Sequence, residues 1–370
     1  MKNKITILLG AGFAQYVKGL STKDINDIFA SYSKWKVGKD TLYNYIENAL
    51  NKYYYDFNFE TFLAVIENIY SYRLSQYRNI QTSVTWKGLS STIFELKPEF
   101  EKCECFKNQE STYDVLCSYI NLLNGKVSNY DDCTKCKEEI NKFKEFIFDL
   151  SKVYDKIKIY STNYDFIVPK ALDLRGECLG VTEVIAKQEF SYNIDKFRQL
   201  PLTYFPLHGC PYIYQETYGC FFLSSIVQVM PFFAQSSRGG NPNEETLFTP
   251  IISGYSKLEH INGRPFNWGF QSFANDCYDS SKIITMGYSY GDKHLNSIIE
   301  TFSNRNIESV TLNNAPNLSA LMSIRVNTNV NGIEDYISNY IKNRKTHRFF
   351  NLSKLKRRLC ELKISIVERI

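Results

Sequence analysis

Three polar side chains near the middle of the chain have the types needed for acid–base chemistry on a ribose hydroxyl or a water molecule. Asn163 and Asp165 follow the strand-like run 157–160, and His208 follows a second such run at 202–207. An amide donates and accepts hydrogen bonds in a fixed geometry. An imidazole, whose ordinary pKa is about 6.5, takes a proton near neutral pH. We therefore expect these residues to share one site.

A glycine-rich turn near the N-terminus has the features of a phosphate-binding loop. The apolar run 5–9 leads directly into Gly10, Ala11, Gly12 and Phe13. Glycine lets the backbone approach a pyrophosphate closely, and the amides that follow donate to phosphate oxygens. In open α/β sheets, ligands bind at the carboxyl ends of the strands. The turn and the three polar residues therefore predict a nucleotide-cleaving site.

The order of these motifs along the chain resembles that of proteins with the sirtuin fold, and specifically of the sirtuin-like proteins of bacterial anti-phage defence. The resemblance implies that the turn from Gly10 to Phe13 holds the pyrophosphate of NAD. It also implies that Asn163 and Asp165 act on the nicotinamide ribose and that His208 is the general base.

Two later segments extend the resemblance. The run 283–286 ends in Gly287 and Ser289, which resemble the second nucleotide-contacting loop of the family, and Asp292 completes a Gly-Tyr-Ser-x-x-Asp pattern of the defence proteins. Asn313 follows another strand-like run, where sirtuins contact the adenosine ribose. The ordered matches cover most of residues 5–315.

The chain departs from sirtuin deacylases in three places. Deacylases carry two Cys-x-x-Cys pairs after the histidine, which build a zinc module; here only Cys210 and Cys220 lie near that place, and the pair at 133–136 precedes it without a second pair. Ala14 replaces the serine of the glycine turn, and residues 19–24 replace the deacylase Asp-Phe-Arg loop. We expect no metal. The departures argue against protein deacylation and leave NAD cleavage open.

Composition favours a cytoplasmic enzyme. The chain has 370 residues, 44% of them hydrophobic, and a formal net charge of +5. Its ten cysteines form no disulfide framework, which predicts reduced thiols. The longest uncharged stretch, 217–237, contains serine, glutamine and proline, so we expect a buried strand and loop there and no membrane contact.

The residue pattern predicts one α/β domain at 1–332 with a Rossmann-like parallel sheet, the sirtuin fold, and a large helical insertion at about 20–150. A basic helical tail is expected at 333–370. Within the insertion, the aromatic cluster at 53–59 favours packing or an oligomer interface over base stacking. The sheet prediction rests on strand-like runs that alternate with helices, at 156–160, 203–207, 250–253, 282–287, 309–312 and 323–326.

The tail is strongly basic. Residues 342–370 hold ten basic and two acidic residues, a net charge of +8. The tail either contacts nucleic-acid phosphates or packs a leucine stripe against a protein partner. We favour the protein contact and expect a homo-oligomer.

Several candidate site residues also have a purely structural interpretation. Asp165 and Ser289 each follow a strand. An Asx turn or a helix N-cap by itself would explain an aspartate or a serine at such a position. His294 is expected to serve packing or an interface, and no pattern supports His260 or His347.

The resemblance implies an NAD+ hydrolase that releases nicotinamide and ADP-ribose, with NAD as substrate, acting as an abortive-infection effector. It also implies control by oligomerisation or by a partner such as a HerA-like ATPase or a short Argonaute protein. Two alternatives remain. One is an NAD-dependent ADP-ribosyl or deacyl transferase. The other is a non-catalytic nucleotide-binding or nucleic-acid-acting subunit of a defence complex.

Overall fold

The structure is a computed structural model. It describes residues 3–51, 57–77, 103–128, 137–165, 167–174, 181–184, 189–192, 194–210, 213–215, 221–223, 233–234, 246–247, 251–252, 261–262, 265–301, 306–311, 326–329 and 332–345.

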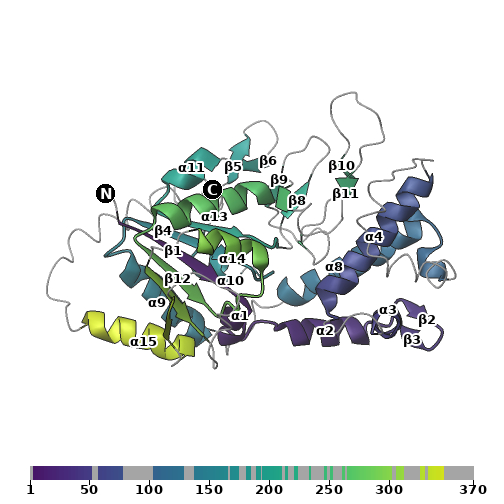
Figure 1. Ribbon diagram of the computed structural model, residues 1–370, viewed down its shortest axis with the longest axis horizontal. Coiled ribbons are helices and arrows are strands. Elements are labelled where there is room, and N and C mark those ends of the chain that lie inside the picture. Colours follow the sequence, from purple (N-terminus) through teal and green to yellow (C-terminus); the bar gives the residue numbers. More distant parts are fainter. Residues whose placement is uncertain are drawn as a thin grey trace, which may run out of the picture.

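In the part of the chain that is described, six strands form one parallel sheet (Figure 1). These are β1 (Lys4–Leu9), β4 (Lys156–Ser161), β7 (Leu202–Pro206), β12 (Lys282–Met286), β13 (Asn306–Val310) and β14 (Val326–Asn329). Their spatial order is β14-β13-β12-β1-β4-β7, and each neighbouring pair is parallel. Counted along the chain, this is the 6-5-4-1-2-3 order of a Rossmann fold. The predicted α/β fold with a parallel sheet is confirmed.

Helices cover both faces of this sheet. The reason is visible in β1, whose six residues are all buried, with Ile5, Ile7 and Leu9 toward one face and Leu8 toward the other. The first face packs against α1 (Ala11–Tyr16), α9 (Lys137–Leu150), α10 (Ile167–Ala171) and α15 (Gly332–Lys345). The second packs against α11 (Ile194–Gln199), α13 (Phe266–Asp279) and α14 (Lys293–Glu300).

A buried polar group joins α13 to the sheet. Lys4 Nζ lies 2.9 Å from Asp276 Oδ1, and the Tyr160 hydroxyl donates to Asp276 Oδ2 at 2.5 Å. A charge inside a protein must be paired to be tolerated. The ion pair therefore fixes α13 over β1 and β4.

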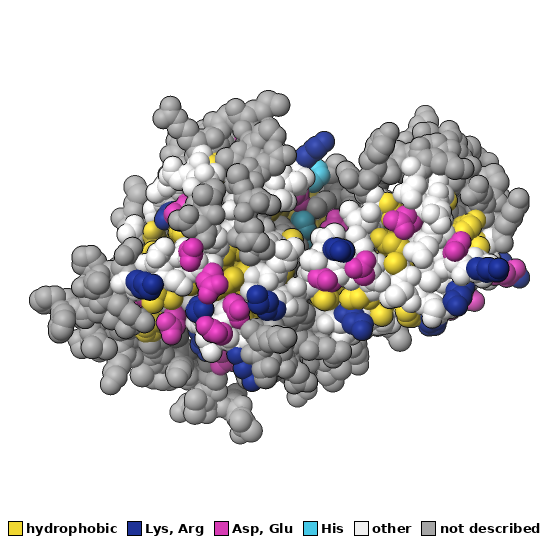
Figure 2. All heavy atoms as spheres, turned by 90° about the horizontal axis from the view of Figure 1, so that it is seen from below, with side chains coloured by type: hydrophobic (Ala, Val, Ile, Leu, Met, Phe, Trp, Pro, Cys, Tyr) yellow, Lys and Arg dark blue, Asp and Glu magenta, His cyan; other side chains and the backbone are white. Residues whose placement is uncertain are grey.

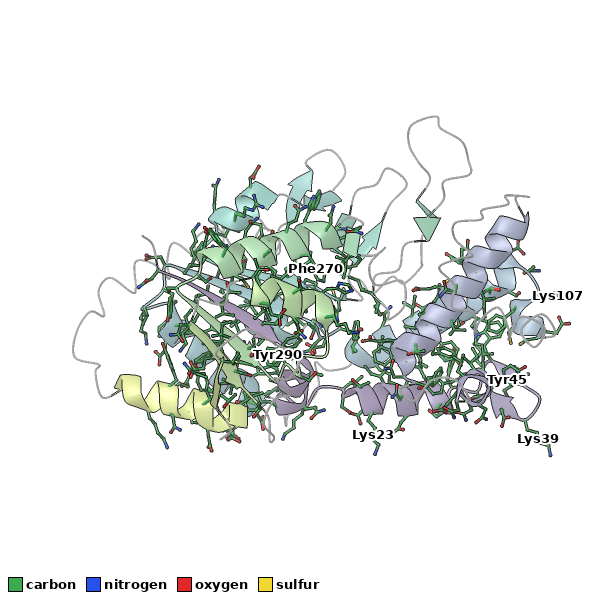
Figure 3. The ribbon with its side chains drawn as sticks, viewed as in Figure 1. Lys23, Lys39, Tyr45, Lys107, Phe270 and Tyr290 are labelled. Carbon is green, nitrogen blue, oxygen red and sulfur yellow. The ribbon has the colours of Figure 1, made fainter. Side chains whose placement is uncertain are left out.

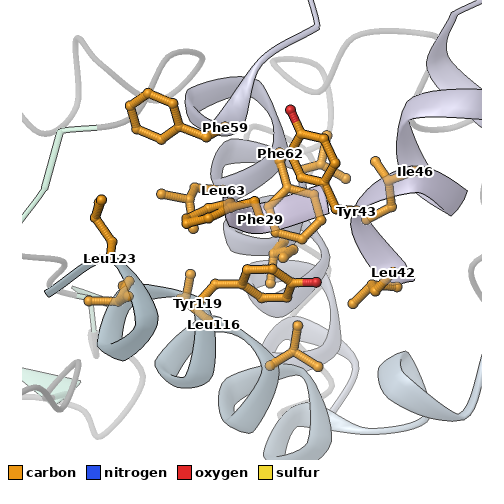
Figure 4. Packing of buried hydrophobic residues seen from close by; sticks show 14 of the residues in the cluster. Phe29, Leu42, Tyr43, Ile46, Phe59, Phe62, Leu63, Leu116, Tyr119 and Leu123 are labelled. Atoms are coloured by element: carbon orange, nitrogen blue, oxygen red, sulfur yellow. The ribbon is translucent and has the colours of Figure 1, made fainter. Parts of the chain in front are cut away.

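The helical insertion, taken here as residues 22–128, forms a separate lobe at the right of Figure 1. Its core is aromatic, and the Phe29 ring lies 5.0–6.2 Å from the rings of Tyr43, Phe59, Phe62 and Tyr119 (Figure 4). Lysines extend from its outer surface (Figure 3). Its elements are α2 (Thr22–Ser31), β2 (Lys36–Val37), β3 (Asp40–Thr41), α3 (Leu42–Leu50), α4 (Phe59–Tyr77), the 3-10 helix η1 (Glu104–Phe106) and α8 (Gln109–Ser128).

Side-chain caps explain where two of these helices begin. The Ser21 hydroxyl accepts from the Asp24 amide while the Asp24 carboxylate accepts from the Ser21 amide, which is a capping box at the start of α2. The Thr41 hydroxyl accepts from the Asn44 amide at the start of α3.

Short hairpins lie outside the main sheet. They pair β5 (Val181–Val184) with β6 (Glu189–Tyr192), β8 (Ile213–Gln215) with β9 (Phe221–Leu223), and β10 (Phe233–Ala234) with β11 (Thr246–Leu247). The uncharged stretch 217–237 contributes only β9 and β10 to the described residues.

Three segments bear on the boundaries predicted from the sequence. Helix α9 falls within the predicted insertion of 20–150, yet Phe143 and Phe146 place it on the sheet. Of the predicted strand at 250–253, residues 251 and 252 are described, and Ile251 makes an isolated antiparallel bridge to Gly209. Helix α15, within the predicted tail, buries Ile337 in the core cluster beside the sheet.

Several sequence predictions lie outside the described residues. They concern Asn313, the cysteines at 133, 136 and 220, and the part of the basic tail from 346 to 370. Among the helices described, none is long and apolar enough to cross a membrane.

Candidate active site

The central strands end on one row of paired residues. Leu9 pairs with both Ser161 and Met286, Ser161 pairs with Pro206, and Met286 pairs with Val310. Parallel strands place their carboxyl ends at the same edge, so every predicted site residue described here follows this row. They are Gly10, Ala11, Gly12 and Phe13 after β1, Asn163 and Asp165 after β4, His208 after β7, and Gly287 and Ser289 after β12.

The glycine turn packs directly against the loop after β12. The Gly10 amide donates to Met286 O and the Gly12 amide to Gly287 O, both at 2.9 Å. A Cβ on Gly12 would lie 2.8 Å from Gly287 Cα, and one on Gly287, whose φ is +62°, would lie 2.2 Å from Phe13 N. The backbones of the two loops therefore lie too close for a side chain at Gly12 or Gly287, which the sequence alone did not reveal.

The rest of the turn divides between surface and core. Ala11 is exposed. The Phe13 side chain is buried and packs edge-to-face on Phe143 at 4.7 Å between ring centroids, while its amide donates to Gly10 O. The Phe13 side chain thus anchors the turn to α9 rather than facing the edge of the sheet.

Asn163 ties the end of β4 to the glycine turn. Its Nδ2 donates to Gly10 O at 3.0 Å, and its amide N–H donates to Ser161 Oγ at 3.0 Å. The side chain is buried, and within the described residues its Oδ1 makes no hydrogen bond. The side-chain amide is consequently held in one orientation.

His208 pairs with a residue to which the sequence assigned no role. Its Nε2 lies 2.9 Å from Asp292 Oδ2, and both side chains are buried. The backbone around the histidine is fixed as well, because Ile252 N donates to His208 O and the Gly209 amide donates to Pro206 O. The sequence feature that points to Asp292 is its position soon after a strand, within the Gly-Tyr-Ser-x-x-Asp pattern.

Asp165 caps the helix that follows it. Its Oδ1 accepts from the Ile167 amide at 3.0 Å, which forms the Asx turn that the sequence offers as a structural reason for this residue. Burial raises the pKa of this carboxyl from 3.8 to about 6, and the backbone hydrogen bonds only partly oppose that rise. Asp165 is therefore ionised only above mildly acidic pH.

Ser289 and His294 lie on the exposed side of the same edge. Ser289 is exposed, and His294 is half-buried in the first turn of α14. Figure 2 shows histidine side chains, in cyan, in a recess where the sheet domain meets the helical insertion. His208 and His294 are the histidines whose side chains the structure describes.

Nothing in the described residues forms a metal centre. No group of three or more His, Cys, Asp or Glu side chains there is arranged to hold an ion. Cys210, one of the two cysteines near the expected place of a zinc module, is buried in the apolar core beside the sheet.

Comparison with known proteins gives a likeness of fold only. Among solved structures, the chain is similar to a triple mutant of a Sir2 homologue bound to 2′-O-acetyl ADP-ribose, with a TM-score of 0.43 and 11% identity over 95% of this chain and 96% of that one. It is also similar to a single mutant of a Sir2 homologue bound to ADP-ribose (TM-score 0.42, 12% identity, 95% and 96% covered). A third is a Sir2 homologue–NAD complex (TM-score 0.41, 11% identity, 93% and 91% covered).

No protein-family model matches the sequence, and no curated protein matches it. At these identities and TM-scores, the likeness identifies neither a ligand nor an activity for this chain. The Rossmann strand order and the row of strand ends are properties of the chain's own structure.

Proposed function

We propose that this chain is an NAD+ glycohydrolase. The supporting observation is that Asn163 and His208 each lie two residues beyond a paired strand end, Ser161 and Pro206, with Asn163 bonded to the glycine turn. The turn follows β1, next to the point where the strand order reverses between β1 and β12. Nucleotides bind at such a point in doubly wound sheets.

The proposed reaction breaks the bond between ribose C1′ and the nicotinamide nitrogen. The electron pair of that bond leaves with nicotinamide, which becomes neutral, and positive charge develops on the ribose. A water oxygen then bonds to C1′ and loses a proton to His208. Asn163 Oδ1 accepts a hydrogen bond from the ribose or from the water and so orients it.

Asp165 has a supporting part in this scheme. Its carboxylate holds the turn between β4 and α10 through the Ile167 amide, and this turn carries Asn163. The products are nicotinamide, ADP-ribose and one proton.

We extend the proposal to a biological role as an NAD-depleting effector of anti-phage defence. Its support is the Gly287, Ser289 and Asp292 pattern, which resembles that of sirtuin-like defence proteins. A homo-oligomer, or a partner such as a HerA-like ATPase or a short Argonaute protein, would then control the activity.

The decisive experiment incubates the purified chain with NAD, alone and with candidate partners, and measures nicotinamide and ADP-ribose by chromatography. Asn163→Ala and His208→Ala should each lower nicotinamide release by about two to four orders of magnitude, because each removes a group that acts in the transition state. His294→Ala, a histidine nearby on α14, is the matched control and should stay within about threefold of the parent.

Two results would reject the proposal. One is nicotinamide release by both Asn163→Ala and His208→Ala at the parental rate. The other is transfer of label from NAD to a protein acceptor without free ADP-ribose, which would indicate a transferase.

A further inference from the structure

Both oxygens of the Asp292 carboxylate are engaged, each in a different task. Oδ1 accepts from the amides of His294 and Leu295, at 2.9 and 3.2 Å, and so caps the N-terminus of α14. Oδ2 lies 2.9 Å from His208 Nε2. One carboxylate therefore joins the end of strand β7 to the start of α14.

The loop before Asp292 is held firmly in place. The Tyr288 hydroxyl lies within hydrogen-bond distance of Asp292 O at 3.2 Å and of Asn296 Oδ1 at 3.0 Å. Asn296 Nδ2 in turn donates to Tyr290 O at 2.7 Å, which stabilises Tyr290 at a φ of +60°. These hydrogen bonds hold the backbone at Tyr290 and Asp292, and with it the position of Asp292 Oδ2.

The surroundings of the histidine are equally defined. The side chains of His208 and Asp292 are only 8% and 6% exposed, and the Tyr164 ring lies 6.4 Å from the imidazole ring. An ionised carboxylate only accepts hydrogen bonds, so its partner nitrogen must carry a proton. In a neutral imidazole the other nitrogen, Nδ1, is then the acceptor.

We infer that Asp292 is a positioning residue that holds His208 in the Nε2–H tautomer, so that Nδ1 is the atom that takes the proton. The tautomer assignment stands on the 2.9 Å contact and on an ionised Asp292 carboxylate, whereas its catalytic consequence rests on the proposed function. The proton passes from the attacking water to Nδ1, and the carboxylate stabilises the imidazolium formed. The same logic applies to the aspartate of serine-protease triads, which orients its histidine without being protonated.

Two substitutions separate this role from helix capping. In Asp292→Asn the amide oxygen must face the His294 and Leu295 amides to keep the cap, so Nδ2 faces His208 and donates to Nε2. The tautomer should then reverse to Nδ1–H. Asp292→Ser keeps a cap acceptor but is too short to hold the imidazole, so it serves as the matched control for the cap.

The first test reads the tautomer directly and needs no enzymatic activity. Nitrogen-15 NMR of the histidine-labelled protein is recorded at a pH where the imidazole is neutral, and His208 among the chain's four histidines is assigned from the His208→Gln spectrum. We expect Nε2–H in the parent, Nδ1–H in Asp292→Asn and a mixture in Asp292→Ser. Nδ1–H in the parent, or Nε2–H in the Asp292→Asn protein, would overturn the inference.

The second test measures NAD hydrolysis by the same variants. Asp292→Asn should lower kcat by about 10²- to 10⁴-fold with KM within about threefold, and Asp292→Ser by about 10- to 100-fold. Parental kcat in Asp292→Asn would refute the catalytic consequence. If the parent itself does not cleave NAD, the proposed function fails while the NMR result still decides the tautomer.

Discussion

The Tyr164 hydroxyl donates a hydrogen bond of 2.6 Å to Glu60 Oε1 and so links the loop between β4 and α10 to the helical insertion. Tyr164 lies between Asn163 and Asp165 in the chain, whereas Glu60 lies in the first turn of α4. The Tyr164 ring also packs edge-to-face on Phe59, with centroids 5.5 Å apart, and joins the core of the insertion. The inserted helices therefore contact the loop that carries the proposed catalytic amide.

Removing this hydroxyl should destabilise the protein measurably. Hydrogen bonds to charged groups contribute about 1.5–3 kcal/mol, so Tyr164→Phe should lower the free energy of unfolding by that amount in urea titrations. The loss should be smaller when Glu60→Gln is already present, because the charge-assisted part is then absent. Tyr16→Phe is the control, since the buried Tyr16 hydroxyl makes no hydrogen bond among the described residues. Equal losses for the two tyrosines would contradict the assignment.

Gly287 should tolerate no side chain, whereas Gly38 should. Both have left-handed φ values, +62° and +65°, but a Cβ on Gly38 meets nothing within 4 Å. Gly38→Ala should therefore cost about 1–2 kcal/mol, the backbone term alone. Gly287→Ala should cost about 1–3 kcal/mol more, because the methyl group collides with the backbone of Phe13. Urea unfolding of both variants checks this. Similar losses of unfolding free energy would mean that the loop after β12 moves away from the glycine turn at little cost.

Burial of Asp165 makes stability depend on pH in a defined direction. Its folded-state pKa of about 6 lies above the ordinary value of 3.8, so the folded protein binds more protons between these values. The free energy of unfolding should then fall as the pH rises from about 4 to 6, and level off above.

Asp165→Asn keeps the acceptor for the Ile167 amide and removes the titration. The variant should match the parent near pH 4 and exceed it by about 1–3 kcal/mol at pH 7.5. Asp195→Asn, which removes an exposed charge on α11, controls for the change in net charge. If the difference between Asp165→Asn and the parent is the same at both pH values, burial does not raise this pKa.

Ser289 should contribute to binding and not to chemistry. One hydrogen bond to a phosphate or ribose is worth about 0.5–1.5 kcal/mol, so Ser289→Ala should raise the Kd for NAD roughly three- to tenfold. Calorimetric titration in the inactive His208→Ala background measures this. As a control, Ser297→Ala, which alters an exposed serine on α14, should leave the Kd unchanged. An unchanged Kd for Ser289→Ala would leave the serine without a ligand role.

The sequence by itself determined the strands and the residues that follow them. Strand-like runs followed by Gly10, Asn163, His208 and Gly287 predicted parallel strands whose ends carry the site, and each of these strands is present. This works because burial on both faces of a parallel sheet favours largely apolar segments that are visible locally, although Thr6, Lys158 and Thr203 are buried polar residues within them. The run at 250–253 shows the limit, because its described residues contribute an isolated antiparallel bridge from Ile251 to Gly209 and no strand of the main sheet.

Only the tertiary structure decided which residues meet. His208 and Asp292 are 84 positions apart, Asn163 and Gly10 are 153 apart, and Tyr164 and Glu60 are 104 apart. Such pairs depend on the order and register of the strands, which set which loops become neighbours. Local sequence preferences do not encode that order, since it follows from how helices and strands pack together to bury both faces of the sheet.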